Sequence, residues 1–287
     1  MNLKEALQEA ARTKTAIGHF NVSNLEGINA IVDVCREVYK PIIVGVSPGE
    51  SDFIGIGVIS DIVKHYRTKY GLPLFLNADH FQDPQLAVYA VEAGFDAVLF
   101  DAAQKTLEEN IKLTKEVATT LKRINPEILV EGELGYIGVG SVVRESVPEG
   151  AVVDESQMIK PEEAKRFVEE TGVDLIGPGV GNIHGIVKGY KENLSFNRIA
   201  EIKAATPAFL VLHGASGIDS DSVKKAVESG VSVVHVNTEL RLAWKNALQK
   251  SLADNPEEIA PYKILKPTIE AIKTVLKEKI AVFNVNG

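Results

Sequence analysis

The run Leu74-Phe75-Leu76-Asn77-Ala78-Asp79-His80 is an apolar segment of strand length that ends in an acid and an imidazole. Such a segment is typical of a strand buried on both faces, and its polar end predicts that the strand opens at a cleft. Nothing in the packing of a core requires an Asp-His pair at that position. We therefore expect Asp79 and His80 to belong to a functional site.

Four further apolar runs also end in polar residues. One carries Glu131 and Glu133, and the other three lead to His184, His213 and His235. The carboxyl ends of parallel strands meet at one end of a barrel, so these side chains are expected to converge there. Groups from several separate strands are what a metal ion or a reacting substrate requires.

Eight apolar segments alternate with helical ones, which predicts an α/β protein with a closed (β/α)8 TIM barrel as a single domain over residues 1–287. An open doubly wound sheet is the alternative. It is disfavoured because no dinucleotide-binding glycine fingerprint follows the first strand. The expected strands are 16–22, 41–47, 74–79, 97–100, 128–133, 175–178, 208–213 and 231–237.

Three helix-to-strand junctions share a glycine, at Gly94, Gly172 and Gly230. Each glycine is expected to take the left-handed conformation that caps a helix, because a Cβ disfavours it. Between the second and third strands, one helix is expected over 51–70.

Two segments differ from this repeat. Segment 135–160 is long and has no helical period, so we interpret it as a mobile lid beside the site. Segment 262–283 has the spacing of an amphipathic helix, which we expect to pack on the barrel or on a partner subunit.

Composition excludes several classes of function. The net charge of −8, without a cluster of lysines and arginines, argues against nucleic acid or an anionic membrane as the main partner. Cys35 is the only cysteine, so no internal disulfide forms and a reducing, cytoplasmic location is expected. The N-terminus starts an amphipathic helix rather than a signal peptide, and no apolar run approaches the length of a membrane span. We expect a soluble protein.

Six segments, taken together and in their order along the chain, are more specific than any single motif. They are 18–26 (Gly-His-Phe-Asn-Val-Ser-Asn-Leu-Glu), 78–80 (Ala-Asp-His), 130–135 (Val-Glu-Gly-Glu-Leu-Gly), 181–185 (Gly-Asn-Ile-His-Gly), 212–217 (Leu-His-Gly-Ala-Ser-Gly) and 237–241 (Asn-Thr-Glu-Leu-Arg). With these segments the chain resembles the class II, metal-dependent ketose-bisphosphate aldolases, which include fructose-bisphosphate and tagatose-bisphosphate enzymes. The resemblance covers the whole chain.

The resemblance implies one catalytic Zn²⁺ ion per chain. Its ligands would be His80, His184 and His213, with Glu133 as an alternate or outer ligand. Neutral imidazoles suit a zinc site with an open position, which polarises a substrate carbonyl. A lone histidine is more often a satisfied polar residue, but three at strand ends favour the metal site. We also expect a monovalent cation near the phosphate site.

The resemblance also gives Asp79 a catalytic role. The matching aspartate exchanges the proton of the hydroxyl whose carbon bond breaks, and this needs a carboxylate within hydrogen-bonding reach. The alternative is that Asp79 only supports the ligand His80.

Phosphate binding is suggested by the glycines beside His213. Glycines let backbone N–H groups approach an anion, and the helix expected near Asp219 adds a positive end. By resemblance, Lys188 and Arg241 lie near phosphates and Ser47 contacts substrate. The full predicted set is Ser47, Gly185, Lys188, Gly214, Ser216, Asn237, Thr238 and Arg241.

The chain departs from the family pattern in its proton relay. The family usually has Gly-Gly-x-Glu-Asp after the fifth strand, and here residues 138–142 read Gly-Val-Gly-Ser-Val without the acid. Glu145 and Glu149 are the nearby acids that would replace it. His235 stands where the family has an asparagine that helps to hold the enediolate. Three roles stay open for His235: a hydrogen-bond donor, a group that titrates near neutral pH, and an added metal ligand.

The hypothesis is a zinc-dependent aldolase that splits a phosphorylated ketose, fructose 1,6-bisphosphate or a close relative, into dihydroxyacetone phosphate and an aldehyde. One alternative is a non-catalytic sugar-phosphate-binding or accessory subunit of the same barrel family. Another is an aldolase for a deoxy-sugar phosphate. The resemblance suggests a homodimer or homotetramer.

Overall fold

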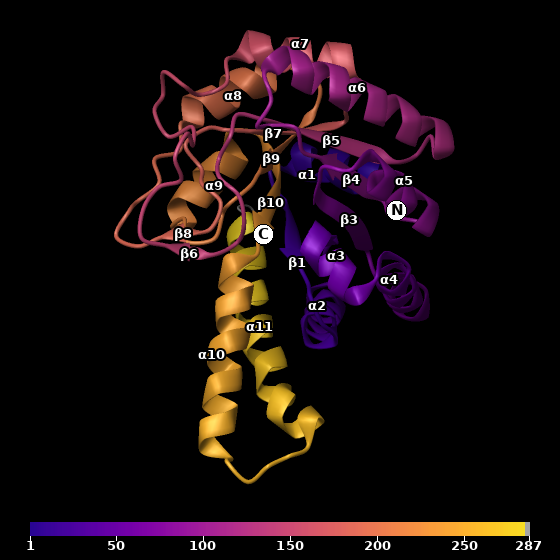
Figure 1. Ribbon diagram of the computed structural model, residues 1–287, viewed down its shortest axis with the longest axis vertical. Coiled ribbons are helices and arrows are strands. Elements are labelled where there is room, and N and C mark those ends of the chain that lie inside the picture. Colours follow the sequence, from indigo (N-terminus) through magenta and orange to yellow (C-terminus); the bar gives the residue numbers. More distant parts are fainter. Residues whose placement is uncertain (285–287) are drawn as a thin grey trace.

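Eight parallel strands close into a barrel in the computed structural model, which describes residues 1–284 (Figure 1). The predicted TIM barrel is therefore confirmed, and the open sheet is excluded. Around the barrel the order is β1 (Ile17–Asn21), β10 (Val231–Val236), β9 (Phe209–Leu212), β7 (Leu175–Pro178), β5 (Leu129–Leu134), β4 (Ala97–Phe100), β3 (Leu74–Phe81) and β2 (Ile42–Val46).

Helices surround this barrel, and one helix boundary differs from the prediction. The single helix expected over 51–70 is wrong, because the chain breaks at Gly55, whose φ is 94°. The helices are α1 (Leu3–Thr13), α2 (Leu25–Val38), α3 (Pro48–Ile54), α4 (Ile56–Tyr70), α5 (Pro84–Ala93), α6 (Leu107–Ile124), α7 (Pro161–Thr171), α8 (Phe196–Ala205), α9 (Ser220–Glu228), α10 (Thr238–Asp254) and α11 (Pro261–Phe283).

Helix α1 closes the amino-terminal end of the barrel. Its apolar face packs on a layer to which each barrel strand contributes one side chain. This end is therefore filled with apolar groups, and a polar site has room only at the carboxyl ends of the strands. The layer consists of Ile17, Ile43, Phe75, Ala97, Leu129, Leu175, Val211 and Val233.

The expected glycine caps are present at two junctions of three. Gly94 and Gly172 are left-handed caps, with φ of 95° and 70°. At the third junction the cap of α9 is Ser229 in a right-handed conformation, and Gly230 follows it with a positive φ of 123°. Gly230 therefore has a backbone conformation that a Cβ disfavours, one residue later than expected, and a Cβ there would also lie 2.7 Å from Cγ of Lys203.

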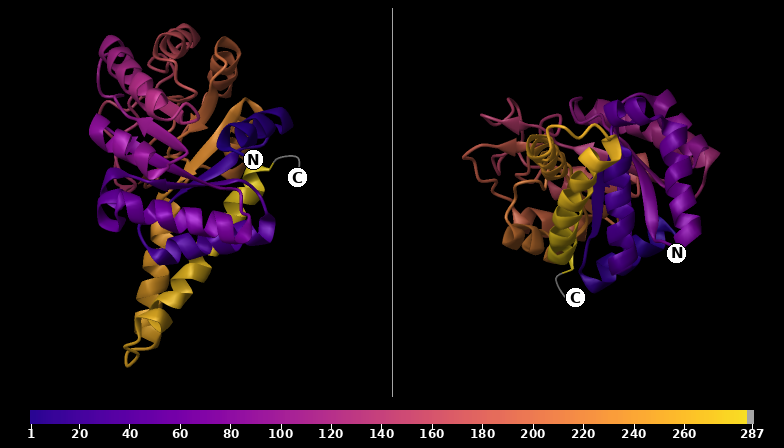
Figure 2. Two further views of the ribbon diagram at one scale, coloured as in Figure 1. Left: turned by 90° about the vertical axis from the view of Figure 1, so that its right-hand side faces the viewer. Right: turned by 90° about the horizontal axis from the view of Figure 1, so that it is seen from below.

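The two segments outside the repeat have defined places. Segment 135–160 contains no helix, and its short strand β6 (Val143–Arg144) pairs with β8 (Ile186–Val187) in the loop after β7. Helices α10 and α11 form a hairpin whose far half extends away from the barrel (Figures 1 and 2). The near half of α11 packs on the barrel, as expected. Within residues 1–284, no helix combines the length and apolar character needed to cross a bilayer.

Candidate active site

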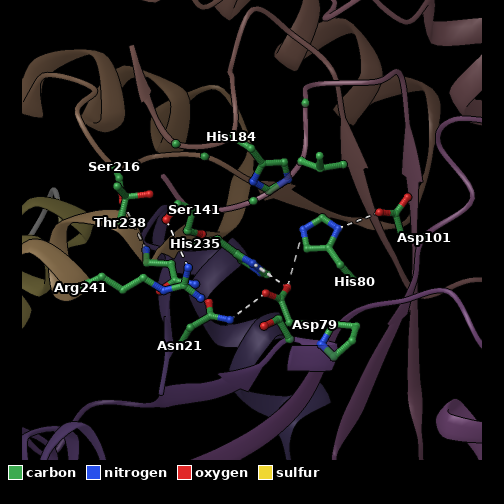
Figure 3. A pocket seen from close by; sticks show the side chains of 18 of the residues that line it. Asn21, Asp79, His80, Asp101, Ser141, His184, Ser216, His235, Thr238 and Arg241 are labelled. Carbon is green, nitrogen blue, oxygen red and sulfur yellow. Dashed lines mark hydrogen bonds and ion pairs between the residues drawn. The ribbon is translucent and has the colours of Figure 1, made fainter. Parts of the chain in front are cut away.

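Asp79 and His80 both line one cavity at the carboxyl end of the barrel (Figure 3). Neighbouring residues in a regular strand point to opposite faces. Here the β3–β4 register shifts between Ala78 and Phe81, and His80 has a φ of 55°. The shift is the mark of a bulge, which turns both side chains to the same side. A left-handed histidine is uncommon, and such strained residues cluster at functional sites.

Three histidines from distant parts of the chain meet in this cavity. His80, His184 and His213 each offer a ring nitrogen, and these three atoms lie within 4.8 Å of one another. The ring centroid of His80 is 4.7 Å from that of His184 and 4.9 Å from that of His213. This spacing suits three ligands around one ion.

Hydrogen bonds leave one free nitrogen on two of these rings. His213 Nε2 lies 2.7 Å from Glu131 Oε1, and its Nδ1 has no partner. His80 Nδ1 lies 3.1 Å from both Asp101 Oδ2 and Glu133 Oε2, while its Nε2 has no hydrogen-bond partner and lies 3.9 Å from Asp79 Oδ1. A histidine that binds a metal through one ring nitrogen usually donates a hydrogen bond from the other nitrogen to a carboxylate. Buried nitrogens without partners fit an ion that the rings would hold.

The charges around the site favour a cation. Burial opposes a positive charge on His80, but Asp79 and Glu133 outweigh it and raise the pKa of His80 well above its usual value. Burial, together with His80 and His213, lowers the pKa of His184 well below its usual value. For Asp79, burial opposes ionisation, but His80 and His235 lower its pKa. The carboxylates thus favour positive charge at His80, and a metal ion bound there would supply that charge in place of a proton.

A second cluster, His19, Asp79 and His235, also brings ligand atoms within 4.8 Å. The rings of His19 and His235 are stacked, with centroids 3.5 Å apart and planes 1° apart. Lone pairs of imidazole lie in the ring plane, so two parallel rings cannot both point at one ion. The first cluster fits a metal, and this one does not.

The cavity has a volume of about 390 Å³. On one side it is lined by Gly214 after His213, by Gly185 after His184 and by Thr238 at the start of α10. Their backbone N–H groups are neutral donors for an anion. Seven of the eight predicted substrate residues line it: Ser47, Gly185, Gly214, Ser216, Asn237, Thr238 and Arg241.

The eighth predicted residue lies elsewhere. The side chain of Lys188 is 62% exposed and pairs with Glu145 at 2.5 Å, outside the cavity lining. This lysine follows β8, and its backbone N–H donates to Arg144 on segment 135–160, which carries it to the surface. Neither Glu145 nor Glu149 lines the cavity, and residues 138–141 of the same segment do. The prediction that Lys188 contacts phosphate is therefore not supported by its position.

Several residues of the site were missed in the sequence. Asp101 directly follows a predicted strand, and Asn21 belongs to a quoted family segment, so both carried a signal. His19 lies in the same quoted segment as Asn21, and Glu131 was already named among the polar strand ends, although neither was assigned a role. Glu50 lies in a short helix, where nothing in the sequence marks it. Asn21 Nδ2 donates to Asp79 Oδ2 at 2.9 Å and to Glu50 Oε2 at 2.9 Å.

Comparison with known families agrees with this geometry. The family model described as "Fructose-bisphosphate aldolase class-II" matches residues 1–287. The chain belongs to this family. A fructose-bisphosphate aldolase from Geobacillus stearothermophilus is 33% identical over 290 residues, which cover 100% of this chain and 98% of the relative.

Two further relatives widen the range of activities in the family. A 6-phospho-5-dehydro-2-deoxy-D-gluconate aldolase from Bacillus licheniformis is 32% identical, covering 100% of this chain and 96% of that protein. The crystal structure of the YdjI aldolase from Escherichia coli K12 superposes with a TM-score of 0.84 at 27% identity, covering 100% and 98% of the two chains. Membership of the class II family thus identifies an aldolase and leaves its sugar open.

Proposed function

We propose that this class II aldolase is zinc-dependent and cleaves a phosphorylated ketose, fructose 1,6-bisphosphate or a close relative, into dihydroxyacetone phosphate and an aldehyde. The observation that carries the proposal is the convergence of His80, His184 and His213 beside Asp79. Zn²⁺ held by these three imidazoles would supply Lewis-acid polarisation of the ketose carbonyl. A monovalent cation near the phosphate site and Glu133 as an outer ligand belong to the same proposal.

Asp79 is the proposed base for carbon–carbon cleavage. Its Oδ2 accepts a hydrogen bond from Asn21, while Oδ1 has no hydrogen-bond partner and lies 3.4 Å from His235 Nδ1. This carboxylate takes the proton of the hydroxyl on the carbon that becomes the aldehyde. The electron pair of the broken bond stays on the three-carbon fragment, which then gains a proton.

His235 is the proposed donor to that fragment. It lines the cavity, is 6% exposed and is held against Asp79. Burial, with His19 and His213, lowers its pKa well below its usual value, so the neutral ring is the working form. A neutral imidazole donates one hydrogen bond and accepts another, which suits an enediolate oxygen.

The phosphate of the three-carbon fragment is proposed to bind beside Gly185, Gly214, Ser216 and Thr238. Ser216 Oγ accepts from the N–H groups of Asn237 and Glu239, at 3.3 and 3.4 Å, which anchors the start of α10 to this turn. Backbone donors and a helix N-terminus are a common way to hold phosphate.

The test is a cleavage assay on protein stripped of metal by a chelator and then reloaded with Zn²⁺, with fructose 1-phosphate and the fructose and tagatose bisphosphates as substrates. Activity should vanish on stripping and return with zinc. Asp79→Asn should lower turnover by roughly 10² to 10⁴ fold while zinc content stays at the wild-type level. Full activity in metal-free protein would contradict the proposal.

One observation favours a non-catalytic binder instead. The cavity-facing part of segment 135–160 is Gly138–Ser141, which carries no carboxylate to move a proton. Under this alternative, sugar phosphates would raise the melting temperature without any turnover. The deoxy-sugar alternative is supported by the Bacillus licheniformis relative and predicts turnover only with deoxy-sugar phosphates.

A homodimer or homotetramer completes the proposal. The far end of the α10–α11 hairpin exposes Ile259 and Tyr262, at 88% and 75%. Exposed apolar side chains on a projecting element are typical of contact surfaces. Light scattering on the purified protein checks the assembly, and a monomer at micromolar concentration would contradict it.

A further inference from the structure

We propose that Glu50 restricts the substrate to a ketose with a single phosphate, so that the aldehyde product is uncharged. This rests on the proposed aldolase function and narrows it. The three-carbon fragment would keep the phosphate, bound at Gly214 and Ser216.

The lining of the cavity contains little positive charge. Within residues 1–284, Arg241 is the only lysine or arginine among the lining side chains, and Asp79 and Asp101 are also there. Lys188 pairs with Glu145 outside. Lys245, one turn further along α10, lines the neighbouring groove rather than the cavity. A second phosphate on the substrate would therefore depend on Arg241.

Arg241 is already paired. Its Nη2 donates to Glu50 Oε1 at 2.6 Å, and its Nη1 donates to the backbone oxygen of Ser141 at 3.2 Å. The guanidinium is thus held on two sides, by the short helix α3 and by segment 135–160. In Figure 3, Arg241 lies on the side of the cavity opposite Asp101.

The Glu50 carboxylate collects the donors that an incoming anion would need. It is 5% exposed. Oε2 accepts from Ser47 N at 2.8 Å and from Asn21 Nδ2 at 2.9 Å. Oε1 accepts from Asn237 Nδ2 at 3.4 Å as well as from Arg241. Glu50 is not itself among the lining residues, but its carboxylate thus occupies donors on four residues of the lining that a substrate phosphate would need.

A phosphate at this end would meet an unfavourable field. It would have to compete with Glu50 for Arg241 and remain beside a buried negative charge. The Arg241 side chain is 42% exposed but Glu50 is buried, so taking Arg241 away would leave a buried carboxylate without its charged partner. Like charges at low dielectric also repel. Hydroxyl groups carry no such penalty and can share the amide donors of Asn21 and Asn237. A neutral aldehyde fragment therefore fits, and a phosphorylated one does not.

The reaction balances with one phosphate. The bond between the carbon next to the ketone and the hydroxyl-bearing carbon breaks, and the hydroxyl proton passes to Asp79. The electron pair stays on the three-carbon fragment, which is protonated to dihydroxyacetone phosphate. The other product is an aldehyde without phosphate.

Acceptor choice in the condensation direction tests the role of Glu50. Zinc-loaded protein is given dihydroxyacetone phosphate with either glyceraldehyde or glyceraldehyde 3-phosphate. We expect wild-type kcat/KM to favour glyceraldehyde at least tenfold. Glu50→Gln keeps an acceptor for Ser47 N but loses the charge, so it should move this ratio at least tenfold toward the phosphorylated acceptor. Glu108→Gln, at an exposed glutamate paired with Arg166, is the matched control and should leave the ratio unchanged.

A binding measurement keeps the inference separate from catalysis. Calorimetry on the wild-type protein compares fructose 1-phosphate with fructose 1,6-bisphosphate, and the single phosphate should bind at least tenfold more tightly. If the protein converts neither acceptor, the aldolase proposal fails. The relative affinity for the single phosphate and the bisphosphate still tests the role of Glu50. A bisphosphate that binds equally well, or a Glu50→Gln ratio equal to that of wild type, would overturn it.

Discussion

The imidazole rings of His19 and His235 lie face to face, with centroids 3.5 Å apart and planes 1° apart. His19 comes from β1 and His235 from β10, and the two residues are partners in register on these neighbouring parallel strands. His19 is fully buried, and its Nε2 lies 3.0 Å from Asn77 Nδ2. The stack therefore fixes the plane of the His235 ring, which contacts Asp79.

Removal of this stack should impair turnover more than metal binding. His19→Leu frees the ring of His235 to rotate, and loss of alignment at a reacting centre typically costs roughly tenfold to a hundredfold in kcat. His19→Phe keeps a flat ring and should retain most of kcat. Steady-state kinetics on both variants, with zinc content measured alongside, check the prediction. Equal losses in the two variants would show that stacking is not what matters. His65→Leu, at an exposed histidine on α4, is the control.

Gly45 makes room for the same ring. A Cβ at Gly45, on β2, would lie 2.0 Å from Cε1 of His19. Gly45→Ala must therefore push His19 aside in a packed barrel, which should lower the free energy of unfolding by about 1 to 3 kcal/mol. Urea unfolding measures it.

The matched control for this change is Gly49→Ala in α3. A Cβ there has nothing within 4 Å, and alanine is favoured over glycine in helices by up to about 1 kcal/mol. The control should be neutral or stabilising. Unchanged stability in Gly45→Ala would mean that the His19 ring moves without cost.

Glu131 should set the zinc affinity without touching the ion. Its carboxylate is 3% exposed and lies 2.7 Å from His213 Nε2, which leaves Nδ1 for the metal. Glu131→Gln weakens this orientation, and such changes typically lower metal affinity about 10 to 100 fold. Competition with a chromophoric chelator measures it. The exposed Glu127→Gln should bind zinc like wild type, and a normal affinity in Glu131→Gln would refute the assigned role.

The loop that carries His184 should lose stability as the pH rises from 4.5 toward 8. Burial raises the pKa of Glu192 from 4.5 to about 8, although the N–H of Ile183, which donates to it at 3.1 Å, acts in the opposite direction. Between these pH values the folded protein keeps a proton that the unfolded chain has released. Stability from this group is therefore full below pH 4.5 and falls as the pH rises toward 8.

Glu192→Gln should remove that dependence. Relative to the variant, wild type should lose on the order of 2 kcal/mol of unfolding free energy between pH 5 and 8. Urea unfolding across this range checks it, with the exposed Glu149→Gln as control. Parallel curves for wild type and Glu192→Gln would exclude a buried, protonated Glu192.

The sequence predicted most of the fold and of the site where the signals are local. Alternating apolar runs and helical spacing predict a barrel, and the polar ends of Leu74–His80 and Phe209–His213 predict a site at one rim. The departures also have local causes, such as Gly55, which divides one expected helix into two. The position of Lys188 could not be predicted in this way, because it depends on the pairing of β6 with β8 between two loops.

By itself, the sequence determined the barrel, the family and the rim where polar groups gather, because strand and helix periodicity and residue order are properties of the chain. Only the tertiary structure decided which groups touch. It turned Asp79 and His80 to one side through a bulge, stacked His19 on His235 over Gly45, and joined Glu50 to Arg241 from 191 residues away. Such contacts depend on register and on the space left by other side chains, which no local pattern in the chain records.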